Sequence, residues 1–555
     1  MGDIYGKALR TVIWLGPSDY HSPKAFRMLS ILGQESSSYV PEGAAEEQHG
    51  SASTTSEGSD PTKIFADAQV LVELRGEVQT LVERPWFNRV WVVQEVALAR
   101  DAQVVCGTDV LDWRVFVLGI TKGLAGGILE RNMLGFVPSS QFDNVLAIAE
   151  AIGESGLPDR PGKGLLRVLQ DYRSRLATDP VDKVYALLNL VSSDVAALGI
   201  TTNYERHYTE VYRATAVAIL LGSSDLNMLG MCEALVEEEQ SVELPSWVPD
   251  WRTTYSNVLP PSIERNGNTH GSNASRGTKS ELRFSADIKI LLLSGYTIDT
   301  IAEISDYLKP MVNEGEWFDY DSMPEEPEWP DVPDLPSDAS LVEIFTSIFR
   351  DSVPALYTGM FNSMSIHYNE LLRPVELLEC FVRWEKFAQS DQKSKKSKTR
   401  IQEDARTIYW KTMCAGNRLL GGDLATEAAF VEWRKSLSAT RNLLRLRADS
   451  VSKTYKPLAF AGYIQKTWRA HSKFNEVIRP AYGRRLARTA KGNLALVRKD
   501  AQVGDQIALF RGGRMPYCVR RVEDAVFIFI GEAYVHGIMN GEAFDGTLCE
   551  AMAIR

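Results

Sequence analysis

The first strong pattern along the chain is a short run of apolar residues. Residues 11–15 read TVIWL, and Gly16-Pro17 ends the run. An apolar, β-branched run of this length predicts a strand buried inside a parallel sheet, with other strands beside it. No strand-like segment comes before it in the sequence. We therefore expect that a strand which would lie beside residues 11–15 in a complete sheet is not encoded by this chain.

The following segments extend this α/β pattern. Residues 34–62 are rich in Ser, Gly and Glu, and they predict a disordered surface insertion. A helix is expected over about 63–83, a second buried strand over 102–106 and a further helix from Leu111. The sequence thus predicts a partial α/β domain with a parallel sheet over residues 1–125.

The remainder of the chain predicts a helical region and a small β unit. Residues 126–260 have mainly helical periodicity. Short β runs at 281–305 and 490–545 predict one small sheet or barrel built from both segments. Between them we expect an acidic linker over 314–340 and a helical insertion over 341–475.

Composition and charge narrow the classes of function. A chain of 555 residues is too long for one hydrophobic core, so several folded units are expected. With 61 Lys+Arg against 72 Asp+Glu, the net charge of −11 disfavours binding to nucleic acid or to anionic membranes. The cysteines form no CxxC pair, which argues against a metal centre. The sequence shows no signal peptide and no apolar stretch of about 20 residues, so we expect a cytoplasmic protein without a membrane span.

The densest motif, RPWFNRVWVVQEVALA, spans residues 84–99. Pro85 suits a helix N-terminus, and in the helix beyond it Trp91 and Glu95 share a largely apolar face. A carboxylate on such a face needs a cation, hydrogen-bond donors or a raised pKa. One interpretation is a structural ion pair with a nearby arginine: Arg84, Arg89 or Arg100. The other is a general base, or a group that holds a sugar hydroxyl in a cleft.

Two further places carry candidate side chains. Asp179, Asp182 and Lys183 lie around a helix-start signal, Asp179-Pro180. They are either catalytic, or a helix cap together with an exposed charge pair. His536 lies at a predicted strand-to-turn position and is either catalytic or structural.

Several blocks of the sequence resemble one known family. Residues 84–99 resemble the final block of the fungal heterokaryon-incompatibility (HET) domain, and residues 1–19, which contain WLG, resemble the end of its middle block. The segment TDPVDKVYALL is similar to the one that usually follows this domain, as is the C-terminal GEAYVHGIM. The residues that carry the resemblance are Trp14, Gly16, Arg84, Pro85, Trp86, Arg89, Trp91, Gln94, Asp179, Asp182, Lys183, Tyr185 and His536.

The resemblance implies a fold and a role. The HET domain is thought to be similar to the Toll/interleukin-receptor (TIR) fold, a flavodoxin-like parallel sheet. HET proteins are associated with fungal non-self recognition and regulated cell death. Some members of the wider group cleave NAD with a Glu near a Trp, and Glu95, four residues after Trp91, is the matching position. The resemblance therefore implies protein partners, no bound cofactor, and NAD as the substrate of any activity.

The resemblance also has a gap. The family's opening block, roughly ALSYxWG, and its LWIDAICINQ stretch are not found in this sequence. Those strands would line the edge at which open α/β sheets bind ligands. We therefore predict an N-terminally incomplete HET domain with impaired signalling and no detectable NAD glycohydrolase activity. The alternatives are an NAD-cleaving enzyme that uses Glu95, an unrelated enzyme, or an inactive fragment.

Overall fold

The computed structural model divides into two compact units. The residues it describes are 2–34, 76–125 and 140–153 in the first unit, and 163–232, 244–253, 272–308, 380–390, 405–415, 427–435, 477–523 and 525–555 in the second. Apart from Gln34, the predicted insertion at 34–62 lies outside the described residues, and so does the predicted linker at 314–340. Of the predicted helical insertion at 341–475, three short helical segments are described.

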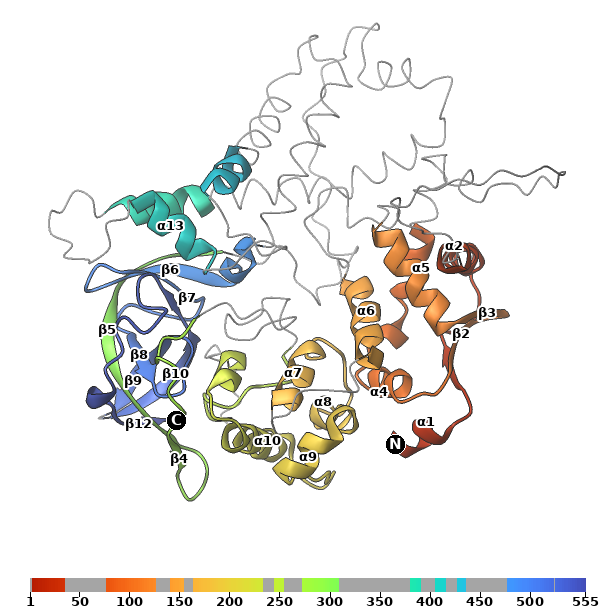
Figure 1. Cartoon of the computed structure of the whole chain (residues 1–555), viewed down its shortest axis with the longest axis horizontal. Helices are drawn as coiled ribbons and strands as arrows, with labels where there is room; N and C mark the ends of the chain where they lie inside the picture. Colours follow the sequence, from red (N-terminus) through yellow and green to blue (C-terminus); the bar gives the residue numbers. More distant parts are fainter. Residues whose placement is uncertain are drawn as a thin grey trace, which may run out of the picture. The chain divides into compact units, whose positions relative to one another are not determined.

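The first unit is a small sheet with helices packed against one of its faces (Figure 1). Helices α2 and α5 contact each other and the sheet. Its elements are α1 (Gly2–Lys7), β1 (Thr11–Trp14), α2 (Ser22–Gln34), a helix over 76–82, the 3-10 helix η2 (Pro85–Asn88), α4 (Trp91–Ala97), β2 (Ala102–Cys106), β3 (Asp109–Asp112), α5 (Trp113–Ala125) and α6 (Ser140–Gly153).

The two faces of this sheet differ in burial. Strand β1 is parallel to β2, and β2 is antiparallel to β3. Ile13, Val104 and Leu111 lie side by side on the buried face. On the opposite face the side chains of Val12 and Trp14 are 58% and 54% exposed. The prediction that this strand is buried inside a sheet is therefore wrong for the described residues, since the helices cover one face only.

The pairing of β2 with β3 corrects a second expectation. The sequence predicts a helix from Leu111, whereas residues 109–112 form β3 and the helix begins at Trp113. Gly107 has a φ of +57°, which allows the tight turn that brings β3 back against β2. A TIR-like parallel sheet is not confirmed, because among the described strands of this unit only β1 and β2 run parallel.

The second unit begins with short helices around two buried tryptophans. Trp247 and Trp251 come from the segment 244–251, which contains turns rather than a strand, and they are nearly fully buried. The Trp251 ring lies edge-on to the Tyr212 ring, with 5.0 Å between centroids, and the Trp247 indole donates to the Lys289 carbonyl at 3.2 Å. The helices are α7 (Lys163–Asp171), α8 (Asp182–Tyr185), η3 (Leu188–Val191), α9 (Ser192–Leu198), α10 (Tyr208–Gly222) and η4 (Asn227–Met231).

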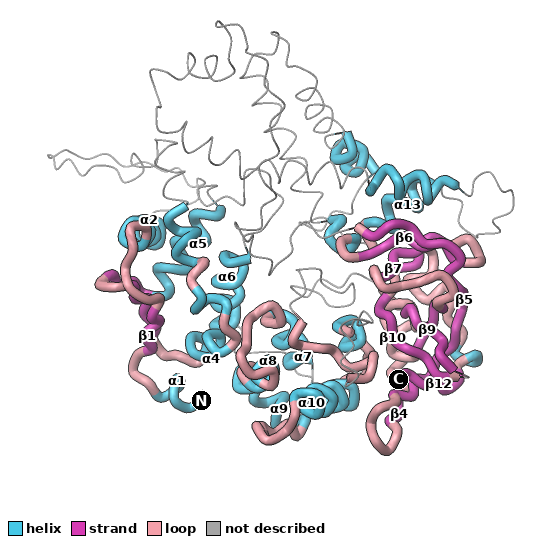
Figure 2. The backbone as a smooth tube through the Cα atoms, turned by 180° about the vertical axis from the view of Figure 1, so that it is seen from behind, coloured by secondary structure: helices cyan, strands magenta, loops and turns pink. Residues whose placement is uncertain are grey.

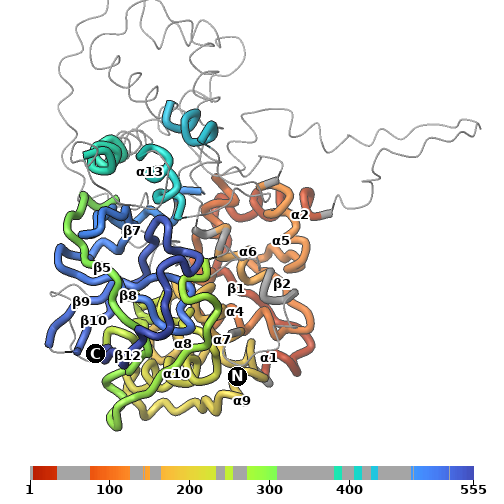
Figure 3. The backbone as a smooth tube through the Cα atoms, turned by 60° about the vertical axis from the view of Figure 1, so that its left-hand side comes forward, coloured from red at the N-terminus to blue at the C-terminus, as the bar shows by residue number. Residues whose placement is uncertain are grey.

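The C-terminal part of this unit is a closed β-barrel with extra strands (Figure 2). Strand β5 (Leu291–Tyr307) pairs with β12 (Glu550–Ile554), and the order continues through β10 (Val526–Glu532), β9 (Tyr517–Glu523) and β8 (Gln506–Phe510), which pairs again with β5. The remaining strands are β4 (Leu282–Phe284), β6 (Arg484–Thr489), β7 (Leu494–Arg498) and β11 (Tyr534–Val535). The C-terminal β unit is therefore present, and strands from two distant segments share one sheet (Figure 3).

Three helical segments that lie between β5 and β6 in the sequence pack on this sheet. They are 380–390, α13 (Ala405–Met413) and 427–435. The Trp384 indole donates to the Asp306 carbonyl at 2.8 Å, and the Arg488 guanidinium of β6 donates to the Phe387 carbonyl at 2.6 Å. Trp384 also belongs to a buried apolar cluster that includes Leu486 of β6. These contacts fix the helical segments to the sheet by both apolar burial and hydrogen bonds.

Gly295 marks the place where β5 has a neighbour on each side. It pairs with Glu550 of β12 and with Phe510 of β8. A Cβ atom at Gly295 would overlap the Phe510 ring and the Leu509 carbonyl.

We expect Gly295→Ala to destabilise the second unit by about 2 kcal/mol through overpacking. The adjacent variant Ser294→Ala should change the stability by less than about 0.5 kcal/mol. Thermal unfolding measures both, and an unchanged midpoint for Gly295→Ala would contradict the closed barrel.

Candidate functional site

Glu95 is held by groups from two other elements of the first unit. It lies on α4, directly after η2, and its carboxylate accepts hydrogen bonds from the Trp86 indole of η2 and from the Tyr5 hydroxyl of α1. Arg89 is the positive charge that acts on it. The Trp86 ring packs edge-on against Trp113 of α5, with 6.5 Å between centroids. The Trp86 indole is thus itself held in place by packing.

Burial determines the acidity of this carboxyl group. Glu95 is half-buried, and burial raises its pKa above the ordinary value, against the opposing effects of Arg89, Trp86 and Tyr5. Burial also raises the pKa of the Tyr5 hydroxyl, and the Glu95 charge raises it further. The Glu95 carboxylate can therefore accept a proton or position the hydroxyl group of a ligand. The same contacts are equally consistent with a purely structural role.

The other two arginines proposed as partners of Glu95 bind elsewhere. Arg84 donates to the Leu15 carbonyl at 2.8 Å and forms an ion pair with Asp19 at 2.6 Å, so it connects η2 to the end of β1. Although burial raises the pKa of Asp19, hydrogen bonds from the backbone N–H groups of Ser22 and His21 and from the Arg84 side chain lower it to about 2. Arg100 donates to the Gly6 carbonyl at 3.0 Å.

The remaining predicted residues of this unit support the local structure. Gly16 follows β1, and its carbonyl accepts from the Gly107 N–H at 2.9 Å. Trp14 lies on the exposed sheet face, Trp91 is half-buried, and Gln94 is fully buried. Pro85 is the first residue of η2, whereas α4 begins only at Trp91. The prediction of one helix beginning near Pro85 is thus corrected to a 3-10 turn followed by a short α-helix.

The second predicted group comprises Asp179, Asp182 and Lys183, and it lies in the helical part of the second unit. Each of these side chains has its own hydrogen-bond partner. The Asp179 carboxylate accepts from the Val181 N–H at 3.1 Å, which is the expected local capping contact. Asp182 accepts from the Tyr204 hydroxyl at 3.0 Å, and the Tyr185 hydroxyl donates to the Asn203 carbonyl at 3.2 Å.

Lys183 corrects the expectation of an exposed charge pair. Its side chain is buried, and its ammonium group donates to the carbonyls of Arg173 and Arg175. Burial, and then repulsion from Arg173, lowers the pKa of Lys183 to about 8, against the attraction of Asp250. The Lys183 side chain faces inward because the chain after α7 turns its carbonyls toward it.

His536 follows β11 and is half-buried, and its backbone N–H donates to the Leu494 carbonyl at 3.0 Å. It belongs to the barrel, whereas Glu95 belongs to the first unit. The structure therefore gives the sequence-predicted candidates three separate local environments. Among these candidates, Glu95 is the carboxylate on which side chains from several elements act.

Two observations concern other kinds of site. Within the described ranges, no three His, Cys, Asp or Glu side chains gather closely enough to hold a metal ion. Among the helices that the structure describes, none is both long and apolar enough to cross a membrane.

Comparison with known proteins shows which families the chain resembles. Residues 1–95 match the model of the heterokaryon incompatibility protein (HET) family, and residues 440–550 match the model of the Het-6 β-barrel domain. The chain is also similar to heterokaryon incompatibility protein 6, OR allele, of Neurospora crassa. The two are 22% identical over 98% of this chain and 78% of the relative.

These matches together support the prediction of a fungal HET-domain protein. The HET match includes β1, η2 and Glu95, while β2 and β3 come after it in the sequence. The Het-6 β-barrel match includes β6 to β11, whereas β5, which closes the barrel, lies before it. No solved structure matches the chain.

Sequence reasoning found Glu95 but missed Tyr5. The sequence around Tyr5, GDIYGK, has no pattern that assigns it a partner. Its role follows from the contact of α1 with α4, which the chain makes across about 90 residues, a span over which local patterns carry no information.

The pH dependence of stability tests this description of Glu95. Because the pKa of Glu95 is raised on folding, its ionised form costs stability, and this cost is relieved as the pH falls through the folded-state pKa. Glu95→Gln should therefore stabilise the first unit at about pH 8, by up to about 1 kcal/mol, and this gain should shrink toward about pH 5.

Tyr5→Phe is the matched variant with the opposite sign. It removes a donor from the ionised carboxylate, so it should destabilise the unit, and most strongly at the higher pH. Thermal unfolding of both variants and the wild type across this pH range provides the measurement. Differences from wild type that stay constant with pH would contradict the proposed burial of Glu95.

Proposed function

We propose that this HET-domain protein acts in fungal heterokaryon incompatibility, within non-self recognition that leads to regulated cell death. The observation that carries the proposal is the similarity, over 98% of the chain, to a protein named for heterokaryon incompatibility. The HET match and the Het-6 β-barrel match lie near opposite ends of the chain, and both support the proposal.

In this proposal the HET domain acts by binding another protein rather than by turning over a substrate. The uncovered face of its sheet supports this mode of action. Val12, Trp14 and Val110 are each more than half exposed there. Trp14 and Val110 both neighbour Val105 in the strand register, so they lie on the same face. Large apolar side chains gathered on one exposed surface are typical of protein-binding sites.

Gene deletion in the host fungus tests the proposed role. The deletion strain is paired with strains that reject the parent, and fused cells are scored for death with a dye that enters only dead cells. We expect the deletion to abolish at least one rejection reaction. A deletion strain that rejects every partner as strongly as the parent does would contradict the proposal.

Complementation separates the sheet face from general effects on folding. A double variant, Trp14→Asp with Val110→Asp, should fail to restore rejection, because charged groups on the sheet face disfavour apolar contact. The control is Val503→Asp, which changes an equally exposed valine in the second unit. It should restore rejection fully. All proteins are compared for cellular amount and unfolding temperature.

NAD glycohydrolysis is the second candidate, and the half-buried carboxylate of Glu95 beside Trp86 favours it. Against it, the Glu95 carboxylate already accepts hydrogen bonds from Trp86 and Tyr5. We expect the purified chain to release no nicotinamide from NAD above the uncatalysed background. Rapid release that Glu95→Gln abolishes would make the protein an NAD glycohydrolase instead.

A further inference from the structure

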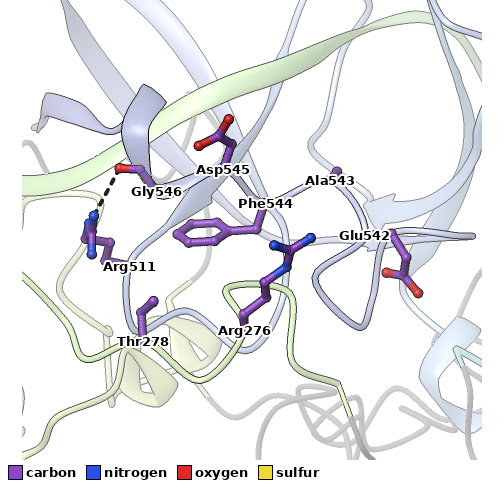
Figure 4. A pocket seen from close by; sticks show the side chains of 8 residues that line it. All are labelled: Arg276, Thr278, Arg511, Glu542, Ala543, Phe544, Asp545 and Gly546. Atoms are coloured by element: carbon purple, nitrogen blue, oxygen red, sulfur yellow. Dashed lines mark hydrogen bonds between the residues drawn. The ribbon is translucent and has the colours of Figure 1, made fainter.

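A pocket of about 620 Å³ opens on the second unit, between the loop that precedes β4 and the loop that leads into β12 (Figure 4). Its size is within the range of pockets that hold small organic ligands. Arg276 and Thr278 line it from the first loop, and Phe544 and Asp545 from the second. Arg511, next to the end of β8, completes its charged lining.

The acidic side chains of the pocket already have hydrogen-bond donors. Glu542 accepts from the Asn540 backbone N–H at 2.8 Å and from the Asn540 side chain at 3.2 Å. Asp545 accepts from the Thr547 N–H at 2.9 Å and from the Thr547 hydroxyl at 2.6 Å. Figure 4 shows both carboxylates directed away from the Phe544 ring. Both carboxylates are therefore oriented by hydrogen bonds from residues of their own loop.

Several hydrogen-bond donors of the pocket have no acceptor among the described residues. Arg276 donates from Nε to the Gly541 carbonyl at 2.8 Å, and its two terminal NH2 groups make no hydrogen bond within the described residues. Thr278 accepts from the Gly512 N–H at 3.1 Å, and its hydroxyl proton has no acceptor in the described part of the chain. The pocket thus offers unused donors to a ligand, while Glu542 and Asp545 each accept hydrogen bonds from residues of their own loop.

Arg511 adds a fixed positive charge. Its Nη2 donates to the Gly546 carbonyl at 3.0 Å, and its Nε lies 3.5 Å from a carboxylate oxygen of Glu281. Phe544 lies between the guanidinium groups of Arg276 and Arg511 (Figure 4). The lining therefore combines an apolar ring with a positive charge on either side of it.

The backbone holds Arg276 in an unfavourable conformation. Its φ is +55°, in the left-handed region, and its N–H donates to the Asn273 carbonyl at 3.0 Å. A residue with a Cβ adopts this conformation at a cost, so the surrounding structure must hold it there. The Arg276 side chain is consequently presented to the pocket from a fixed loop.

We propose that this pocket binds a small organic anion, a phosphate or carboxylate group attached to a flat apolar body. The anionic group receives hydrogen bonds from Arg276 and Thr278 in the field of Arg511, and the apolar body lies against Phe544. This site goes beyond the proposed role in incompatibility, because it gives the barrel a ligand of its own.

Calorimetric titration of the purified full chain tests the proposal. The probes are phenyl phosphate, benzoate, inorganic phosphate and phenol. Phenyl phosphate or benzoate should bind, and the stronger of the two identifies the anionic group. Phenol lacks the charge and inorganic phosphate lacks the ring. Each should therefore bind at least about tenfold more weakly than the better organic anion. No binding of either organic anion at millimolar concentration would overturn the proposal, and so would equal binding of inorganic phosphate.

Variants locate the binding site. Arg276→Gln should weaken binding of the better probe by about tenfold, while Arg276→Lys, which keeps the charge, should weaken it less. Arg283→Gln is the matched control, because Arg283 is an exposed arginine on β4 outside the pocket lining. It should bind like the wild type. Thr278→Val provides a second test if Arg276→Gln does not fold. Unchanged binding in the folded pocket variants would overturn the assignment.

Discussion

The second unit depends on the hydrogen bonding of one long strand. Strand β5, Leu291–Tyr307, pairs with β12 at its beginning, with β8 in its middle and with β6 at its end. A single straight strand has two edges, and β5 uses both of them near Gly295, where the absence of a side chain lets β8 come close. Within the ring β5-β12-β10-β9-β8, closure removes the free edges that an open sheet of these strands would expose to other chains.

The sequence predicted the strands better than it predicted their surroundings. The TVIWL run is a strand, but its apolar composition did not reveal that Val12 and Trp14 remain exposed, because burial depends on which elements arrive from elsewhere in the chain. The short segment at Asp109–Asp112 has too few residues for a period of two to be distinguished from a helix start. Local patterns therefore identify a strand more readily than its neighbours.

The candidate site shows the same division. Glu95 could be selected from the helical spacing around Trp91, since a carboxylate on an apolar face needs compensation. The source of that compensation could not be selected. Of three nearby arginines only Arg89 acts on Glu95, and the other donors are Trp86 and Tyr5. Lys183 shows the opposite error. Its position near two aspartates predicts an exposed side chain, whereas its ammonium group donates to backbone carbonyls in the interior.

The chain order of the barrel has a consequence for biosynthesis. The ribosome completes β5 long before it makes β6, which begins at Arg484, or β12, which ends at Ile554. Until then the nascent strand has apolar side chains and backbone groups without their final partners, a condition that favours association with other chains. Helper proteins that shield nascent segments should therefore matter more for the yield of this protein than for one whose paired strands are consecutive.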